Sequence, residues 1–214
     1  MNKMLKLSAI ALLATSTSLM AQTKSFEGPS VGIFGGAIGA EAAGSVTGTA
    51  TTGSGSLGKV SGIAGVDLAY GFAGGALAVG ATYVPFKAKF GSGSGNDSTS
   101  GTSITGELSD HYTIYIQPTY VVNKDSALFA KVLYAHADIK TTNTTSASSD
   151  VDGWGAGVGL KTFLTPTTFI QVEGNYTDYD SIRGTKLNST GGGTTTVNAD
   201  LKTVQALITL GYKF

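Results

Sequence analysis

The last twelve residues, Thr-Val-Gln-Ala-Leu-Ile-Thr-Leu-Gly-Tyr-Lys-Phe at 203–214, alternate between two kinds of side chain. The even positions, from Val204 to Phe214, are apolar or aromatic, whereas the odd positions are mostly small or polar, with Leu207 as the exception. A period of two places the two sets on opposite faces of a β-strand. An apolar face that ends in aromatic residues is typical of a strand in a membrane β-barrel.

The same alternation recurs along the chain and predicts eight strands. We expect them at about 30–40, 59–72, 76–90, 105–122, 127–140, 150–164, 168–183 and 199–214. Three of the connections are short, at Ala73 to Gly75, Asn123 to Ser126, and Thr165 to Thr167. The other four are long and rich in Gly, Ser, Thr and Asn, at about 41–58, 91–104, 141–149 and 184–198. Short turns at one end and long loops at the other favour an up-and-down barrel over a soluble β-sandwich.

We therefore predict an all-β fold, an eight-stranded antiparallel up-and-down transmembrane β-barrel. The apolar set of each strand is assigned to lipid and the small or polar set to the lumen. The first strand is ambiguous, because its apolar residues do not choose one face. The strands have to close into a barrel, since an open edge would leave backbone groups unpaired in hydrocarbon.

The aromatic residues fall into two groups that mark the two borders of the membrane. One group lies near the short turns (Tyr70, Phe72, Tyr120, Tyr212 and Phe214), and the other lies toward the long loops (Tyr83, Tyr112, Tyr134, Trp154 and Tyr176). Tyr112 and Tyr120 are on one predicted strand, and their spacing corresponds to roughly 20 Å along the barrel axis. The two groups are thus expected to be aromatic girdles on either side of an apolar band.

The first 21 residues have the pattern of a secretory signal. Lys3 and Lys6 precede a short apolar run, and Ala21 is a plausible cleavage point. We therefore expect a signal peptide at 1–21 and one barrel domain at 22–214. Of the fourteen basic residues, two belong to the signal, so the mature chain carries twelve against fourteen acidic residues, a net charge of −2.

The composition excludes several classes of function. The chain has no Cys, which rules out disulfides and thiolate metal sites. A near-neutral chain without a basic patch argues against nucleic acid as a partner. The Gly-rich stretches lack the Gly-Lys-Ser/Thr motif of a phosphate loop. We expect no cofactor.

Four charged residues are predicted on the lumen face in the half nearer the turns: Asp67, Lys131, Lys161 and Glu173. The turn near Pro166 brings Lys161 close to Glu173 in the expected register. Two acids and two bases in one layer predict a charge-compensated network, because buried charges need partners. One interpretation is that the network fills the lumen, as side chains do in barrels of this size. The other is that it is a latch that gates a narrow pore.

A set of aspartates is predicted at the rim beside the long loops: Asp110, Asp138, Asp150, Asp152, Asp178 and Asp180. The expected register places Asp152 beside Asp180. One hypothesis is that Asp150, Asp152, Asp178 and Asp180 hold Ca²⁺ or Mg²⁺ that bridges to lipopolysaccharide phosphates, since hard cations prefer oxygen ligands. The alternative is a solvated polar collar.

Signals for catalysis are few. The chain has two histidines, His111 and His136, and a barrel lipase or acyltransferase would need a nucleophile and a base in mutual reach. His136 near Ser146 or Ser148 is the only such combination that the pattern offers. We therefore predict a non-enzymatic protein and keep a lipid-modifying enzyme as a third alternative.

The leader, the strand pattern over about 30–214 and the final Gly211-Tyr212-Lys213-Phe214 together resemble the small outer-membrane β-barrel proteins, namely the OmpA membrane domain, OmpX and the opacity-type proteins. The resemblance implies a monomer in the bacterial outer membrane, with lipid and lipopolysaccharide around it. It also implies recognition by the barrel-assembly machinery through Tyr212 and Phe214, although Thr209 stands where a glycine is often found. The leading function is then envelope integrity or surface interaction through long extracellular loops, and the alternative is a narrow porin-like diffusion channel for small solutes.

Overall fold

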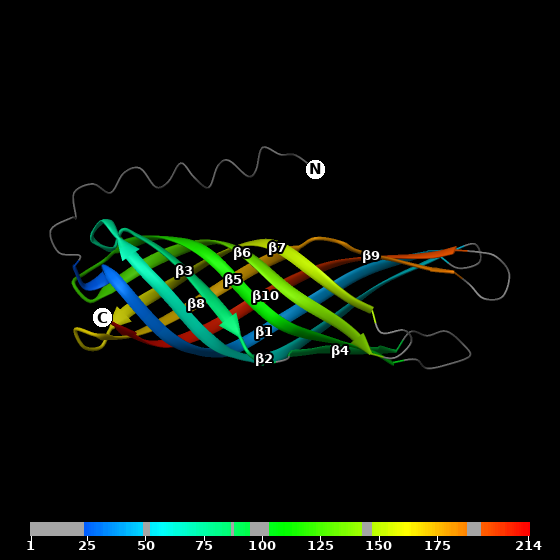
Figure 1. Ribbon diagram of the computed structural model, residues 1–214, viewed down its shortest axis with the longest axis horizontal. Helices are drawn as coiled ribbons and strands as arrows, with labels where there is room; N and C mark the ends of the chain where they lie inside the picture. The colour runs from blue at the N-terminus through cyan, green and yellow to red at the C-terminus, as the bar shows by residue number, and fades with distance from the viewer. Residues whose placement is uncertain (1–23, 49–51, 87, 95–102, 143–146, 188–193) are drawn as a thin grey trace.

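The computed structural model describes residues 24–48, 52–86, 88–94, 103–142, 147–187 and 194–214. These residues form ten strands and two short 3-10 turns (Figure 1). The strands are β1 (Gly28–Gly48), β2 (Thr52–Phe72), β3 (Leu77–Val84), β4 (Ala88–Ser94), β5 (Ser103–Val121), β6 (Ser126–Thr142), β7 (Ala147–Phe163), β8 (Thr168–Tyr179), β9 (Ile182–Leu187) and β10 (Thr194–Lys213). The turns are η3 (Lys24–Phe26) and η4 (Ala73–Gly75). In the described part of the chain, no helix has the length and apolar character needed to cross a membrane.

Each strand pairs antiparallel with its neighbours, and the first and last strands close the sheet into a barrel. The pairing of β1 with β10 runs from Ser30↔Lys213 to Gly48↔Thr195. The predicted antiparallel eight-stranded barrel is therefore confirmed, because β3 with β4, and β8 with β9, are each one pass of the chain interrupted near its outer end. The three predicted short turns are confirmed as well.

The two interruptions divide the outer end of the barrel into two sheets. Pro85 and Phe86 separate β3 from β4, and Asp180 and Ser181 separate β8 from β9. Beyond these points β4 pairs only with β5, and β9 pairs only with β10. The outer end thus consists of a first outer sheet, β9-β10-β1-β2, and a second outer sheet, β4-β5-β6-β7; in Figure 1 they extend to the upper and lower right.

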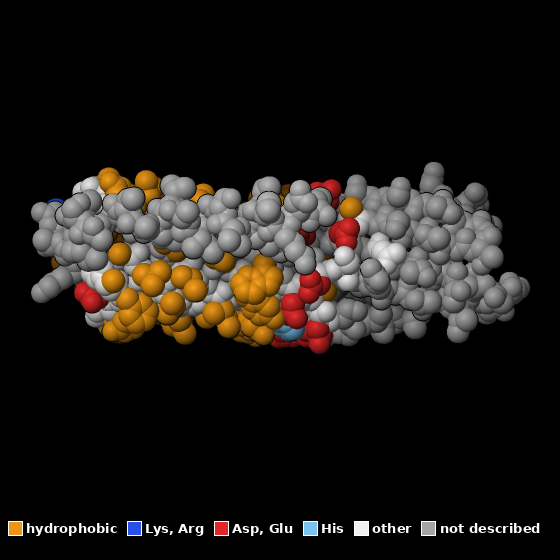
Figure 2. Space-filling model, turned by 90° about the horizontal axis from the view of Figure 1, so that it is seen from above, with side chains coloured by type: hydrophobic (Ala, Val, Ile, Leu, Met, Phe, Trp, Pro, Cys, Tyr) orange, Lys and Arg blue, Asp and Glu red, His pale blue; other side chains and the backbone are white. Residues whose placement is uncertain are grey.

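The alternation of burial along the strands follows the predicted faces. From Leu201 to Gly211 the odd positions are buried, and from Lys202 to Phe214 the even positions are exposed; Phe214 is 71% exposed. The ambiguous first strand is resolved by the structure: Phe34 and Ile38 point inward and Ile33 points outward. Exposed apolar side chains form a band, seen on one face in Figure 2. Exposed Tyr70, Phe72, Tyr120, Tyr212 and Trp154 are among the aromatic residues at its borders.

The extent of the long loops is the part of the prediction that is wrong. The segment 41–58 was expected to be a loop, yet β1 continues to Gly48 and β2 begins at Thr52. The predicted loops at 91–104, 141–149 and 184–198 are likewise shortened by β4, β5, β6, β7, β9 and β10. The physical reason is that an antiparallel ladder satisfies backbone groups in water as well as in lipid, so Thr-rich segments extend the strands past the bilayer.

Candidate functional site

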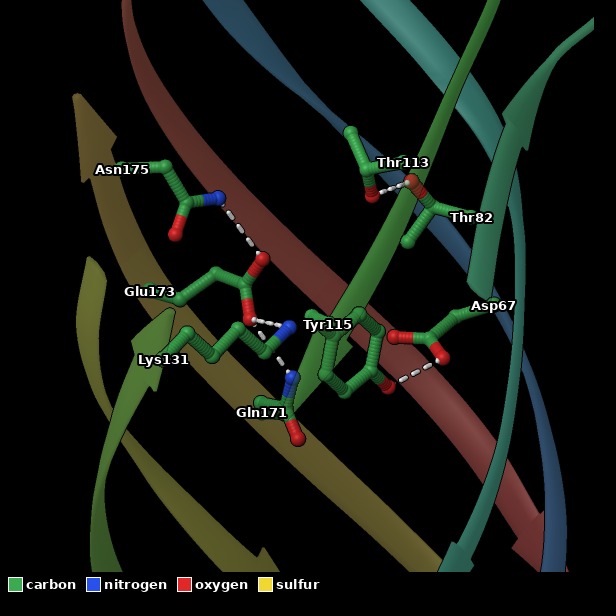
Figure 3. Close-up of polar contacts among 8 residues, drawn as sticks. All are labelled: Asp67, Thr82, Thr113, Tyr115, Lys131, Gln171, Glu173 and Asn175. Atoms are coloured by element: carbon green, nitrogen blue, oxygen red, sulfur yellow. Dashed lines mark hydrogen bonds and ion pairs between the residues drawn. The ribbon is translucent and has the colours of Figure 1, made fainter. Parts of the chain in front are cut away.

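The lumen is crossed by a layer of polar side chains that come from four strands. This lumenal layer consists of Asp67, Tyr115, Lys131, Gln171, Glu173 and Asn175, and Figure 3 shows them together with the hydrogen-bonded pair Thr82 and Thr113. All six are inward-facing and buried. They are held there by the strand register, because odd positions of β2, β5, β6 and β8 face the barrel axis.

An ion pair between Lys131 and Glu173 forms the centre of the lumenal layer. Lys131 Nζ lies 2.6 Å from Glu173 Oε2, and the two side chains are 2% and 3% exposed. Gln171 donates a hydrogen bond of 2.7 Å to the same oxygen, and Asn175 donates one of 2.9 Å to Oε1. Lys131 also lies over the ring of Tyr115, 4.1 Å from its centroid. The carboxylate therefore has three donors, which is what a buried charge requires.

The other two predicted lumen charges have different surroundings. The Tyr115 hydroxyl donates a hydrogen bond of 2.8 Å to Asp67 Oδ1. Lys161 is opposite Gln171 in the register of β7 and β8, and its ammonium lies 3.7 Å from the ring centroid of Phe169. The expected register placed Lys161 close to Glu173, but Lys161 is opposite Gln171, and the ion pair of Glu173 is made by Lys131 on β6.

Little space remains on either side of the lumenal layer. A cavity on the turn side, lined by Asp67, Gln117 and Lys161 among others, offers about 20 Å³ to the centres of water molecules. A cavity on the loop side, lined in part by His111 and Asn175, offers about 10 Å³. A volume of about 10–15 Å³ admits one water molecule. Each cavity therefore has room for about one water molecule, and side chains fill the rest of the lumen at this level.

The turn end of the lumen is covered by an aromatic cluster that the sequence did not reveal. Phe26, from η3, packs edge-on against Phe163 with 5.1 Å between ring centroids, and Phe163 packs in the same way against Phe169. Glycine at position 75 lets Phe26 pack here, because a Cβ on residue 75 would lie 2.3 Å from Cβ of Phe26. Phe26 is only 8% exposed. The available signal was the lone aromatic residue shortly before the first strand.

The outer border of the apolar band carries the predicted aspartates, visible as a red zone next to the orange band in Figure 2. Asp110, Asp150, Asp178 and Asp180 are exposed, and Asp138 and Asp152 are partly exposed. The predicted adjacency of Asp152 and Asp180 is confirmed, because the Asp180 N–H donates a hydrogen bond of 2.7 Å to the Asp152 carbonyl oxygen. Among the described residues, no three His, Asp or Glu side chains converge as ligands of a metal ion would. The cation hypothesis thus remains a prediction, with no preformed site in this part of the chain.

His136 is the centre of a polar cluster at this rim. Its Nδ1 lies 2.7 Å from Asp152 Oδ1, its Nε2 lies 3.7 Å from Asp138 Oδ1, and its ring stacks on that of Tyr112. The Tyr134 hydroxyl donates a hydrogen bond of 2.6 Å to the same Asp152 oxygen. Asp152 lies beyond Trp154, outside the apolar band, and the hydrogen bonds from Tyr134 and His136 lower the pKa of its carboxyl group.

The contacts of His136 bear on the alternative of a lipid-modifying enzyme. Both ring nitrogens face carboxylates. Ser146 lies outside the described residues, and the side chain of Ser148 is not described. His111 is buried in the lumen, where its Nε2 lies 3.1 Å from the Tyr179 hydroxyl. Among the described side chains, the polar contacts of the two histidines are thus with Tyr179, Asp138 and Asp152, and none is with a serine.

Comparisons with known proteins agree with this geometry. A family model described as outer membrane protein beta-barrel domain matches residues 9–214. Among solved structures, OprG from Pseudomonas aeruginosa is 13% identical, with a TM-score of 0.61, and the match covers 88% of this chain and 97% of OprG. The attachment invasion locus protein Ail of Yersinia pestis is 18% identical, with 88% and 99% covered and a TM-score of 0.46. The outer membrane protease OmpT of Escherichia coli is 9% identical, with 88% and 97% covered and a TM-score of 0.48. No curated protein matches the chain.

Proposed function

The chain belongs to the family of outer membrane protein β-barrel domains, and we propose that it is a closed, non-enzymatic barrel that supports the envelope and acts at its outer surface. Family membership and the OprG fold place it in the bacterial outer membrane. The neighbouring structures are mostly non-enzymatic barrels, and OmpT is a protease, so the role within this class is the subject of the proposal.

One observation carries the proposal: the buried Lys131–Glu173 pair, with Gln171, Asn175 and Tyr115 around it, occupies the centre of the lumen. An ion that crosses the barrel would have to displace these hydrogen bonds and expose two charges that are satisfied only by each other and their neighbours. The Phe26 cluster is a second obstruction at the turn end. With the lumen filled, the part of the molecule available for partners is the outer end, where strands extend beyond the apolar band.

Single-channel recording of the refolded protein in a planar bilayer tests the proposal. Folding is confirmed beforehand by heat-shifted mobility on a gel. We expect no steady current from the folded barrel. A steady current from the wild-type protein would contradict the proposal and favour the alternative, a narrow diffusion channel for small solutes.

A cellular experiment tests the envelope role. A deletion strain is compared with the parent for uptake of an apolar dye that an intact outer membrane excludes. We expect faster uptake in the deletion strain and recovery with the wild-type gene. Unchanged uptake in the deletion strain would remove envelope integrity from the proposal and leave surface interaction.

A further inference from the structure

In the part of the chain that the structure describes, the outer part of β7 has an edge without a neighbouring strand. Pairing of β7 with β8 runs outward from Phe163↔Phe169 to Gly153↔Tyr179, and the last hydrogen bond joins the Asp180 N–H to the Asp152 carbonyl oxygen. After Ser181 the chain resumes as β9, which pairs with β10 and not with β7. Among the described residues, Ala147 to Asp152 of β7 therefore pair with a strand on the β6 side only, apart from the bonded carbonyl oxygen of Asp152.

The direction of the backbone groups on this edge follows from that last hydrogen bond. In an antiparallel strand, the N–H and C=O groups of successive residues point alternately to the two sides. Because the Asp152 carbonyl points toward β8, the backbone groups of Asp150 and Ser148 point the same way. On the β6 side, His136↔Asp152 and Asp138↔Asp150 are then pairs without mutual backbone hydrogen bonds, whose side chains lie closest together. The contact between the His136 and Asp152 side chains agrees with this assignment. A row of donors and acceptors is thus available on β7.

This edge of β7 lies outside the lipid. Ala147–Asp152 lies beyond the outer aromatic residues Trp154 and Tyr176 in the register of β7 and β8, on the side of the exposed aspartates. Along this stretch β9 runs beside β10 and is not a close neighbour of β7. One strand inserted between two others needs about 4.8 Å on each side. At the other interruption, by contrast, β2 and β4 run close together.

The charge around the opening selects the kind of strand that would enter. Asp150 and Asp152 lie on β7, and Asp178 and Asp180 lie at the outer end of β8; three of these carboxylates are exposed and Asp152 is partly exposed. A basic segment would be attracted, and an acidic one would be repelled. The sequence of β9 contains Arg183 and Lys186, so the competing occupant of this edge is β9 itself.

We propose that the free edge of β7 at Ala147–Asp152 binds a basic, extended polypeptide segment of another protein by β-strand addition. The backbone groups of Ser148 and Asp150 supply the ladder, and the aspartates supply the preference for positive charge. The inference rests on the proposed function, since it names the class of partner that the outer surface would bind.

Peptide binding to the full-length barrel in phosphatidylcholine nanodiscs tests the proposal, because this lipid has no net charge. The probe is a fluorescent ten-residue peptide of alternating Lys and Val, measured by anisotropy. Two matched controls are the Glu–Val peptide and a Lys–Val peptide with N-methylated alternate backbone amides. We expect both controls to bind weaker by about tenfold or more, since each loses either charge attraction or ladder hydrogen bonds. Equal binding of the N-methylated peptide would overturn the proposal in favour of a purely electrostatic contact.

A reversible disulfide tests where the peptide binds. The chain has no Cys, so Asp150→Cys with Ile182→Cys introduces a single bond that closes the edge in continuation of the β7–β8 register. We expect oxidation of this variant to abolish binding of the Lys–Val peptide and reduction to restore it. The control, Asp138→Cys with Asp150→Cys, joins two strands that are already paired, and its oxidation leaves binding intact. Binding that is equal in the oxidised and reduced forms of the first variant would overturn the proposal.

Two further outcomes are decisive. If the first disulfide forms completely in the absence of peptide and the wild-type protein does not bind the Lys–Val peptide, β9 occupies the edge and the proposal is wrong. If the disulfide does not form, the comparison of the Lys–Val peptide with its N-methylated form tests the proposal by itself. A steady current in the bilayer experiment would contradict the proposed function, whereas a silent barrel that binds no peptide would contradict only this inference.

Discussion

Lys131 and Glu173 form an ion pair across the lumen, 2.6 Å between Nζ and Oε2, although 42 residues separate them in the chain. The two residues are on β6 and β8, with β7 between them, so the contact spans the curved inner wall of the barrel. Both side chains are buried in the lumen.

Removing one partner of this pair is predicted to destabilise the barrel. Glu173→Gln removes the carboxylate that is paired with the buried Lys131 ammonium, which costs about 3–5 kcal/mol. The measurement is urea unfolding in lipid vesicles, followed by heat-shifted gel mobility. The control is Lys131→Met with Glu173→Leu, which should lose less stability because no uncompensated charge remains. A single variant as stable as the wild-type protein would contradict the structural role of the pair.

The aromatic cluster at the turn end is predicted to shield the lumen from the periplasmic side. In a Gln117→Cys background, Phe26→Ala should increase the rate at which a water-soluble thiol reagent labels the cysteine, because Gln117 and Phe26 line the same cavity. Phe86→Ala is the matched control, since Phe86 is 66% exposed and does not line that cavity. Equal labelling rates with and without the Phe26 ring would show that it does not seal the lumen.

The glycines of β7 are predicted to be intolerant of larger side chains where they face inward. A Cβ on Gly159 would lie 2.3 Å from Cζ of Phe129 and 2.4 Å from the Val172 carbonyl oxygen. Gly159→Ala should therefore cost about 1–3 kcal/mol through overpacking. Gly62 has no atom within 4 Å of the corresponding position, so Gly62→Ala should be neutral or slightly stabilising. Denaturant unfolding of the two variants checks this, and equal losses at both sites would contradict it.

The rim cluster predicts a pH dependence on the acid side. Because Tyr134 and His136 lower the pKa of the Asp152 carboxyl group, its stabilising contribution is present above the ordinary aspartate pKa of about 3.9 and is lost as the pH falls through the lower folded-state pKa. Wild-type and Asp152→Asn unfolding midpoints, measured from pH 2 to 6, should differ at the upper end of this range and converge toward its lower end. A difference that does not shrink on acidification would exclude this origin.

The sequence was sufficient for the barrel and its faces, but it gave the lumenal contacts only in part. Asp67, Lys131 and Glu173 could be placed inside because parity along a strand fixes the face of a side chain. Their partners could not be assigned, since the distance across a curved wall depends on the shear and closure of the whole barrel. The contacts of Tyr115 with Asp67 and Lys131 required the register of three strands at once.

The ends of the strands illustrate the same limit. Gly, Ser and Thr between about 41 and 58 were interpreted as a loop, because local composition favours turns there. Pairing with an already formed neighbour outweighs that preference, and β1 and β2 continue together to Gly48 and Thr52. Pro85 was an unused signal, because proline cannot donate to a ladder and marks an edge or a break in a strand.

By itself, the sequence determined that this chain is an antiparallel barrel with an apolar outer face, because a two-residue period and aromatic borders leave few other ways to satisfy a backbone in lipid. Only the tertiary structure decided that Lys131, and not Lys161, pairs with Glu173, that Phe26 covers the turn end, and that β7 keeps a free edge beside Asp150. These features depend on closure of the sheet and on where β8 leaves β7, and both are set by the pairing of all the strands together.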